Sequence, residues 1–265
     1  DAGADSIIVA IENGGKDLIR VIDNGCGMNA DDAMLAFERH STSKIKTVED
    51  ITHIGSLGFR GEALPSIASV SKLHLVTRTA EEEMATIVEY ANGKLNNVTK
   101  TSANIGTAVT VRGLFKDLPA RRKFLKTAQV EARHILKYIH YQALVYPQIS
   151  FRLVIDDKEK LNYIACPERK QRIEEVFGSG FFADDVIPVE GKYNDYSVSG
   201  YIFGLEDRAD KLIDAQYTFI NGRYIFDKTV RHSIKSAYEP FILKTRTWQK
   251  GTTPPYILFL EIPPE

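Results

Sequence analysis

A short glycine-rich run, Asp23-Asn24-Gly25-Cys26-Gly27-Met28, limits the folds that are open to this chain. It ends a predicted strand and opens a predicted helix. Glycines two residues apart let a flat base or a phosphate approach the backbone without a Cβ clash. A carboxylate at the strand end can accept a hydrogen bond from an exocyclic amine such as that of adenine. The run therefore indicates either an ordinary Asn-Gly turn or a nucleotide-binding loop at a strand–helix junction.

Two widespread phosphate-binding patterns do not fit the chain. Gly25-x-Gly27-x-x-Ala30 matches the start of the dinucleotide fingerprint, which needs a second strand ending in an acidic residue about 20 residues on. The residues at that distance are predicted to form a helix and then a polar loop. The sequence also lacks the Gly-x-x-x-x-Gly-Lys-Ser/Thr run of a Walker loop. These mismatches exclude a Rossmann domain and a P-loop NTPase.

A second glycine-rich run, from Gly55 to Leu64, spaces its glycines three apart and leads into a predicted helix. Backbone N–H groups in such a turn, backed by a helix N-terminus, form an anion site. Thr42-Ser43-Lys44 adds hydroxyls and an ammonium group, and residues 41–61 are too long for an ordinary connection, which favours a functional lid. A flexible glycine-rich loop is the alternative. Two such runs favour nucleotide binding, with Thr107 after Gly106 as a third contact.

The composition is typical of a globular protein with a hydrophobic core. Of 265 residues, 43% are hydrophobic and 26% are charged, which excludes a disordered chain. Two cysteines are too few for a disulfide framework or a cysteine-rich zinc module. No apolar run approaches the roughly 20 residues of a membrane span. We expect a cytosolic protein and, because the chain opens without Met, a piece of a longer one.

Apolar periodicity predicts an α/β chain with two domains. The predicted strands are 6–12, 17–22, 72–79, 85–91, 107–114, 151–155, 161–165, 197–204, 216–220 and 256–262. The predicted helices are one of about three turns capped by Asn29, then 62–70, 119–145, 172–177 and 228–238. A new series of predicted helices and strands begins around residues 166–180, which places a domain boundary near residue 166.

The net charge of −1 conceals two basic segments. Residues 112–137 hold eight Lys/Arg against two Asp/Glu, and residues 215–250 hold seven against two, so the rest of the chain is acidic. Lys228, Arg231 and Lys235 recur at i, i+3 and i+7 and share one helix face. With Arg223 they form a stripe that suits the phosphates of a nucleic-acid backbone. A solvated helix face is the alternative.

Four motifs together carry a family resemblance. They are Asp23-x-Gly25-x-Gly27, Thr42-Ser43-Lys44 followed by Gly58-Phe59-Arg60-Gly61-Glu62-Ala63-Leu64, Leu118-Pro119-Ala120-Arg121-Arg122-Lys123-Phe124-Leu125, and Phe219-Ile220-Asn221-Gly222-Arg223. In this order they resemble the N-terminal ATPase region of the MutL mismatch-repair family, and the resemblance covers the whole chain. That family belongs to the GHKL ATPases, with the ATP-hydrolysing component of DNA gyrase, the ninety-kilodalton heat-shock chaperone and histidine kinases.

The resemblance implies an α/β (α+β) fold: a Bergerat-type ATPase sandwich over residues 1–166 and a ribosomal-protein-like βαβ domain over residues 167–265. It implies that Asp23 recognises adenine and that the backbone of the second glycine run holds phosphates. The implied nucleotide-binding residues are Asp23, Gly25, Gly27, Thr42, Ser43, Lys44, Gly58, Phe59, Arg60, Gly61, Glu62, Ala63 and Thr107. The implied DNA-binding residues are Arg223, Lys228, Arg231 and Lys235.

The catalytic groups of the family are not assigned to this chain. The Glu that activates the attacking water and the Asn that holds Mg²⁺ are expected upstream of Asp1, and a phosphate-contacting Lys is expected after Glu265. Glu38 has the character of a helix-surface acid. Glu62 lies where N–H groups face an anion. Neither is therefore taken as the general base.

The implied function is DNA mismatch repair of MutL type. Slow ATP hydrolysis with Mg²⁺ would order residues 41–61, drive N-terminal dimerisation and close a clamp on DNA. The implied partners are DNA, a second copy, the mismatch-recognition protein MutS and a downstream nuclease or helicase, with no membrane. The motifs resemble bacterial ones, which implies a cytoplasmic, nucleoid-associated protein, or a nuclear one in a eukaryote. The alternatives are a non-catalytic DNA- or partner-binding module with a vestigial nucleotide site and another GHKL ATPase such as a topoisomerase component.

Overall fold

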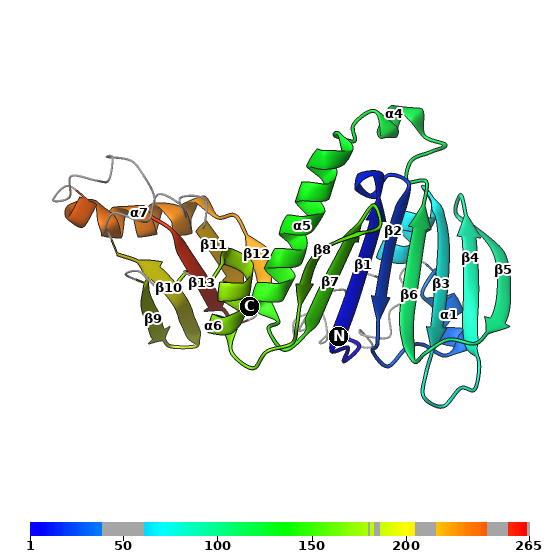
Figure 1. Ribbon diagram of the computed structural model, residues 1–265, viewed down its shortest axis with the longest axis horizontal. Helices are drawn as coiled ribbons and strands as arrows, with labels where there is room; N and C mark the ends of the chain where they lie inside the picture. Colours follow the sequence, from blue (N-terminus) through cyan, green and yellow to red (C-terminus); the bar gives the residue numbers. More distant parts are fainter. Residues whose placement is uncertain (39–60, 180, 183–185, 205–215, 243–253, 264–265) are drawn as a thin grey trace. The chain divides into compact units, whose positions relative to one another are not determined.

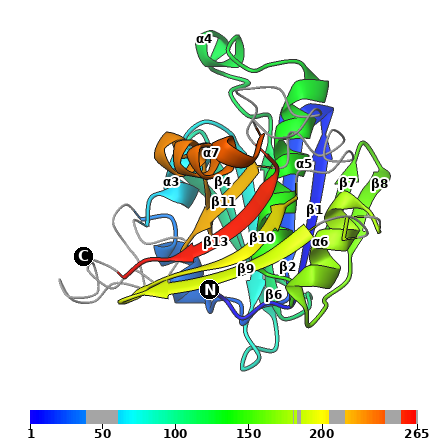
Figure 2. The same cartoon turned by 90° about the vertical axis from the view of Figure 1, so that its left-hand side faces the viewer.

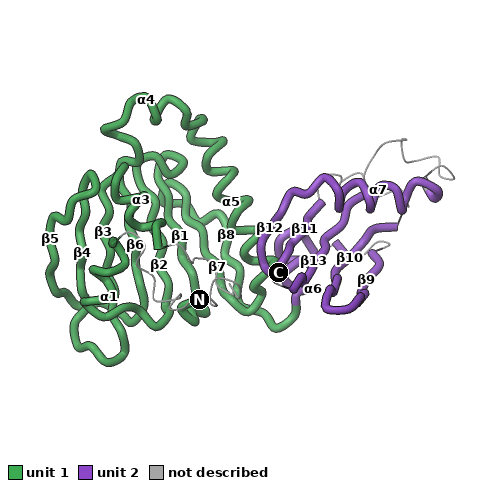
Figure 3. Tube along the Cα trace, turned by 180° about the vertical axis from the view of Figure 1, so that it is seen from behind, with its two compact units in different colours: residues 1–168 green, residues 169–265 purple. Residues whose placement is uncertain are grey.

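The computed structural model describes residues 1–38, 61–179, 181–182, 186–204, 216–242 and 254–263. The chain divides into two compact units, residues 1–168 and 169–265, which Figure 3 distinguishes by colour. Each unit contains one β-sheet, and each is described by itself below.

An eight-stranded sheet forms the first unit (Figure 1). Its strands are β1 (Ser6–Glu12), β2 (Leu18–Asp23), β3 (Lys72–Arg78), β4 (Ala85–Ala91), β5 (Lys94–Thr101), β6 (Gly106–Arg112), β7 (Ser150–Ile155) and β8 (Lys158–Tyr163). Their order is β5-β4-β3-β6-β2-β1-β7-β8. β1 pairs with β7 in parallel, and the other neighbours pair antiparallel. This order places the ends of β2, β6, β3 and β4 side by side.

Among the described residues of this unit, the helices are η1 (Asn13–Gly15), α1 (Ala30–Leu35), α3 (Ala63–Ala68), α4 (Pro119–Arg122) and α5 (Ala128–Val145). The predicted helical stretch 119–145 consists of two helices, because residues 123–127 between α4 and α5 are not helical. Thr127 caps α5 by accepting a hydrogen bond from the Val130 N–H at 3.4 Å, and the Glu131 carboxylate accepts one from the Lys126 N–H at 2.7 Å. These reciprocal caps start a new helix at that point.

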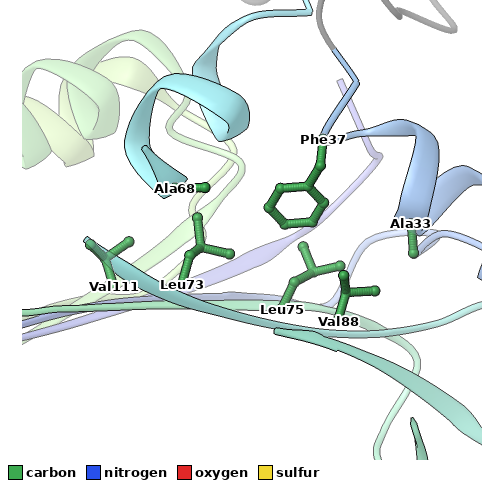
Figure 4. Packing of buried hydrophobic residues seen from close by; sticks show 7 residues of the cluster. All are labelled: Ala33, Phe37, Ala68, Leu73, Leu75, Val88 and Val111. Carbon is green, nitrogen blue, oxygen red and sulfur yellow. The ribbon is translucent and has the colours of Figure 1, made fainter. Parts of the chain in front are cut away.

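The core of the first unit lies on one face of the sheet, beneath α1 and α3. Alternate residues of neighbouring strands form cross-strand rows on this face. The first row is Val21, Val109, Leu75 and Val88, and the second is Ile19, Val111, Leu73 and Tyr90. Figure 4 shows Phe37, Ala33 and Ala68 facing the buried strand residues. Phe37 stacks on Tyr90 with ring centroids 4.2 Å apart, which fixes the chain beyond α1 against β4.

A five-stranded sheet forms the second unit (Figure 2). Its elements are α6 (Arg169–Phe177), β9 (Val186–Tyr193), β10 (Tyr196–Phe203), β11 (Gln216–Ile220), β12 (Arg223–Ile225), α7 (Lys228–Ile242) and β13 (Tyr256–Glu261), with the strand order β12-β11-β13-β10-β9. β11 and β13 pair in parallel, and Phe219 stacks on Phe259 at 5.0 Å. The Tyr238 hydroxyl donates to the Phe203 carbonyl at 2.7 Å and ties α7 to β10.

Three observed strands, β5, β9 and β12, are missing from the prediction. β5 is exposed along almost its whole length, with Leu95 and Val98 as its only apolar residues, and β12 has only three residues. Neither has the apolar alternation on which a strand prediction depends. Among the described residues, no helix is both long enough and apolar enough to cross a membrane.

Candidate nucleotide-binding site

The helix-covered face of the first sheet ends in a row of polar side chains. Asp23 of β2 pairs with Thr107 of β6, Thr107 with Thr77 of β3, and Thr77 with Thr86 of β4. Strand alternation places these side chains on the same face as Leu73 and Leu75. Thr77 and Thr86 are 1% and 0% exposed. A carboxylate and three hydroxyls thus lie in register next to two apolar rows.

The first glycine run continues from this row and is held by short hydrogen bonds. The Asp23 carboxylate accepts a hydrogen bond from the Gly25 N–H at 2.9 Å, and the Cys26 N–H donates to the Ala2 carbonyl at 2.9 Å. The Asn24 side chain accepts from the Ser6 N–H at 3.0 Å and donates to the Asp5 carboxylate at 2.6 Å. These hydrogen bonds tie the loop to the N-terminal segment and to its own strand end.

Two glycines of the site are required by backbone contacts. Gly27 has φ +69°, and a Cβ there would collide with the Arg78 carbonyl oxygen. Gly106 has φ +120°, and a Cβ there would collide with the Asp23 carbonyl oxygen. At Gly25 a Cβ would lie 2.7 Å from the Ala2 carbonyl oxygen. The glycines thus let the loop pack closely against Ala2, Arg78 and Asp23, whose backbone atoms already close the positions that a Cβ would take.

Thr77 joins the loop to the sheet and was not found by the sequence reasoning. Its hydroxyl accepts a hydrogen bond from the Met28 N–H at 2.8 Å. The same oxygen lies 3.1 Å from the Gly106 carbonyl oxygen and 3.0 Å from the Thr107 hydroxyl. The sequence around Thr77 shows only the alternation of apolar and polar residues that is typical of a strand. Only the register with β6, about 30 residues away, reveals its position.

The helix that follows the loop starts as predicted. The Asn29 side chain accepts a hydrogen bond from the Asp32 N–H at 2.8 Å, which confirms Asn29 as the N-cap of α1.

Close to α1, the pKa of the Tyr90 hydroxyl is raised above its usual value, mainly by burial and secondly by the negative charge of Glu38.

The second glycine run is described only at its end. Gly61 has φ +61°, and Glu62 and Ala63 are exposed at the start of α3. Six residues of the predicted phosphate site lie outside the described residues: Thr42, Ser43, Lys44, Gly58, Phe59 and Arg60. The predicted lid therefore stays a prediction. Within the described ranges, no group of three or more His, Cys, Asp or Glu side chains is placed to hold a metal ion.

The predicted DNA-binding residues lie in the second unit on β12 and α7. Arg223 is exposed after the Asn221-Gly222 turn, and Lys228 is exposed in the first turn of α7. Arg231 and Lys235 are half-buried, and the Arg231 guanidinium lies 5.8 Å from the centroid of the Phe226 ring. Lys228, Arg231 and Lys235 recur at i, i+3 and i+7 of α7 and so form one basic helix face, whereas Arg223 lies on β12.

Comparison with known proteins identifies the family. The MutL protein of Chlorobium phaeovibrioides is 40% identical over the whole chain, and that of Porphyromonas gingivalis is 39% identical. The chain is a MutL homologue. It spans about two fifths of the length of these MutL relatives, 42% and 41%. The family described as "DNA mismatch repair protein, C-terminal domain" matches residues 173–265 of this chain.

Solved structures confirm the predicted fold class of this MutL homologue. The Aquifex aeolicus MutL ATPase domain complexed with ADP matches with a TM-score of 0.70 at 28% identity, covering all of this chain and 87% of that one. The N-terminal domain of a DNA repair protein matches with a TM-score of 0.77 at 27% identity, covering 99% and 79%. The ATPase region of Saccharomyces cerevisiae topoisomerase II shares the fold, with a TM-score of 0.58 at 12% identity. The GHKL-type fold is therefore common to these proteins, and the sequence similarity favours MutL over a topoisomerase.

Proposed function

We propose that this MutL homologue binds ATP at the Asp23 end of its first sheet and uses slow ATP hydrolysis to control DNA mismatch repair. The observation that carries the proposal is the in-register row of Asp23, Thr107 and Thr77 beside a glycine loop that packs too closely against the sheet to admit a Cβ. The match to a MutL ATPase domain complexed with ADP supports it.

Each part of the site has a separate role in this proposal. The Asp23 carboxylate accepts a hydrogen bond from the exocyclic amine of adenine, and Gly25 and Gly27 shape the pocket by letting its loop pack against the sheet. Thr107 contacts the base beside Asp23. Thr42, Ser43 and Lys44, with the backbone of residues 58–63, hold the phosphates. The described residues fit a base, whereas no residue of the chain is assigned to Mg²⁺ or as the general base.

The wider cycle is proposed from the family. The two units correspond to an ATPase domain (1–166) and a transducer domain (167–265). ATP with Mg²⁺ drives dimerisation of the N-terminal regions, and the basic face at Arg223, Lys228, Arg231 and Lys235 contacts DNA phosphates without reading sequence. MutS and a downstream nuclease or helicase are the protein partners, and the compartment is the bacterial cytoplasm.

The experiment that tests the proposal is calorimetric titration of the chain with ATP, comparing Asp23→Asn with the wild type. Asn keeps an oxygen for the Gly25 N–H but presents an amide donor instead of a second acceptor to the adenine amine. Losing a charged hydrogen bond is expected to weaken ATP binding about 30-fold or more. Asp17→Asn is the control, because that exposed carboxylate lies at the opposite end of β2. Unchanged ATP affinity in Asp23→Asn would refute the adenine role.

A further inference from the structure

Thr77 is a buried hydroxyl without a role in the function described so far. It is 1% exposed and lies between the glycine loop and Thr107. A threonine hydroxyl has one proton to donate and two lone pairs with which to accept. One lone pair takes the Met28 N–H at 2.8 Å. Its single proton can then be donated to only one of two neighbours, the Gly106 carbonyl or the Thr107 hydroxyl.

Two acceptors compete for that proton at similar distances. If Thr77 donates to the Thr107 hydroxyl at 3.0 Å, the proton of Thr107 is turned outward and can be donated to a ligand. If Thr77 donates to the Gly106 carbonyl at 3.1 Å, Thr107 can donate its proton back to Thr77 and then only accepts from a ligand. The proton of Thr77 thus decides whether Thr107 offers a donor or an acceptor.

The chemistry of adenine favours one of these arrangements. Asp23 and Thr107 are cross-strand partners on one face, so their side chains can reach adjacent atoms of one ligand edge. On that edge the exocyclic amine is a donor and the neighbouring ring nitrogen N1 is an acceptor. When the carboxylate takes the amine, a hydroxyl that contacts N1 directly must donate to it.

We propose that Thr77 is a positioning residue that turns the Thr107 hydroxyl outward as a donor to N1 of adenine. The inference rests on the proposed binding of ATP at Asp23. The relay runs from the Met28 N–H to Thr77, from Thr77 to Thr107, and from Thr107 to the base. Guanine presents an oxygen to Asp23 and an N1–H to Thr107, so the same polarity rejects guanine at both positions.

The test measures the dissociation constants of ATP and of 1-deaza-ATP, in which a C–H group replaces N1. The chain is compared with Thr77→Val, which keeps the shape but removes the hydroxyl, and with Thr77→Ser, which keeps the hydroxyl. We expect the wild type and Thr77→Ser to prefer ATP about 5- to 10-fold, the effect of one hydrogen bond. Thr77→Val and Thr107→Val are expected to bind the two nucleotides within about twofold of each other.

A structural role for Thr77 gives a different result. If Thr77→Val weakens ATP and 1-deaza-ATP equally and keeps the wild-type ratio, the relay is overturned. The relay is also overturned if the wild type binds ATP and 1-deaza-ATP with equal dissociation constants. This outcome does not depend on Thr77→Val, so the test holds even if thermal unfolding shows that this variant does not fold. Absence of ATP binding to the wild type would instead refute the proposed function, so the two failures are distinguishable.

Discussion

The Asp23 end of the first sheet and the basic face of α7 are built by different means. At the Asp23 end, backbone atoms lie too close to Gly27 and to Gly106 to admit a Cβ, and the buried Thr77 hydroxyl connects the loop to β6. On α7, long side chains at the border of a packed helix face supply only charge. A single added atom should therefore disrupt the first region, whereas the second should respond to substitutions in proportion to the charge removed.

The largest effect is expected for Gly27→Ala. The new Cβ would collide with the Arg78 carbonyl oxygen and would require an unfavourable φ of +69°, so the free energy of unfolding should fall by about 3 kcal/mol. ATP binding should be lost with it, because the loop must move away from Thr77. Chemical denaturation and calorimetric ATP titration measure the two effects.

Gly3→Ala is a matched control for this substitution. Gly3 has the same φ of +69°, but nothing lies within 4 Å of its Cβ position. The free energy of unfolding of Gly3→Ala should therefore fall by only about 1 kcal/mol, the cost of placing an alanine at positive φ. If both variants lose equal stability, the close approach at Arg78 does not determine the structure of the loop, and the contrast between the two regions fails.

A smaller effect is expected on the basic face. Arg231→Glu combined with Lys235→Glu should weaken DNA binding about tenfold at low salt, because two phosphate contacts are lost. The slope of log Kd against log salt should fall by about 2. Nucleotide affinity should stay unchanged. Fluorescence anisotropy with a labelled duplex at several salt concentrations measures both quantities.

The control for the basic face reverses two charges elsewhere. Lys158→Glu combined with Lys160→Glu changes the net charge equally on exposed positions of β8 in the first unit. Equal loss of DNA binding in the two double variants would show that only net charge matters. The residues of α7 would then be an ordinary solvated face.

The first glycine run could be interpreted from the sequence in part, because some of its requirements are local, whereas the contacts of Gly25 with Ala2 and of Gly27 with Arg78 are not. A glycine with positive φ, a strand-ending carboxylate and the Asn29 cap depend on neighbours within a few residues. The break before α5 is also local, but the predicted helix passed through it because Arg121, Arg122 and Lys123 are compatible with a helix. The hydrogen bonds of the Thr127 and Glu131 side chains instead start a separate helix, α5, at Ala128.

Residues whose roles depend on distant register could not be predicted. Thr77 acquires its partners from β6 and from the loop at Met28, which lie about 30 and 49 positions away in the sequence. β5 forms because its backbone pairs with β4, although its side chains are mostly polar and almost all exposed. The lid residues 42–44 and 58–60 lie outside the described residues, so their site still rests on the motif alone.

The measurement that tests the central claim most directly is a map of ATP contacts by amide chemical shifts. The labelled chain is titrated with ATP, and the backbone amide signals are followed. The account predicts the largest shifts at Gly25, Met28, Gly106 and Thr107, with small changes along α7. Largest shifts on α7, or an unchanged spectrum around Asp23 at saturating ATP, would contradict it.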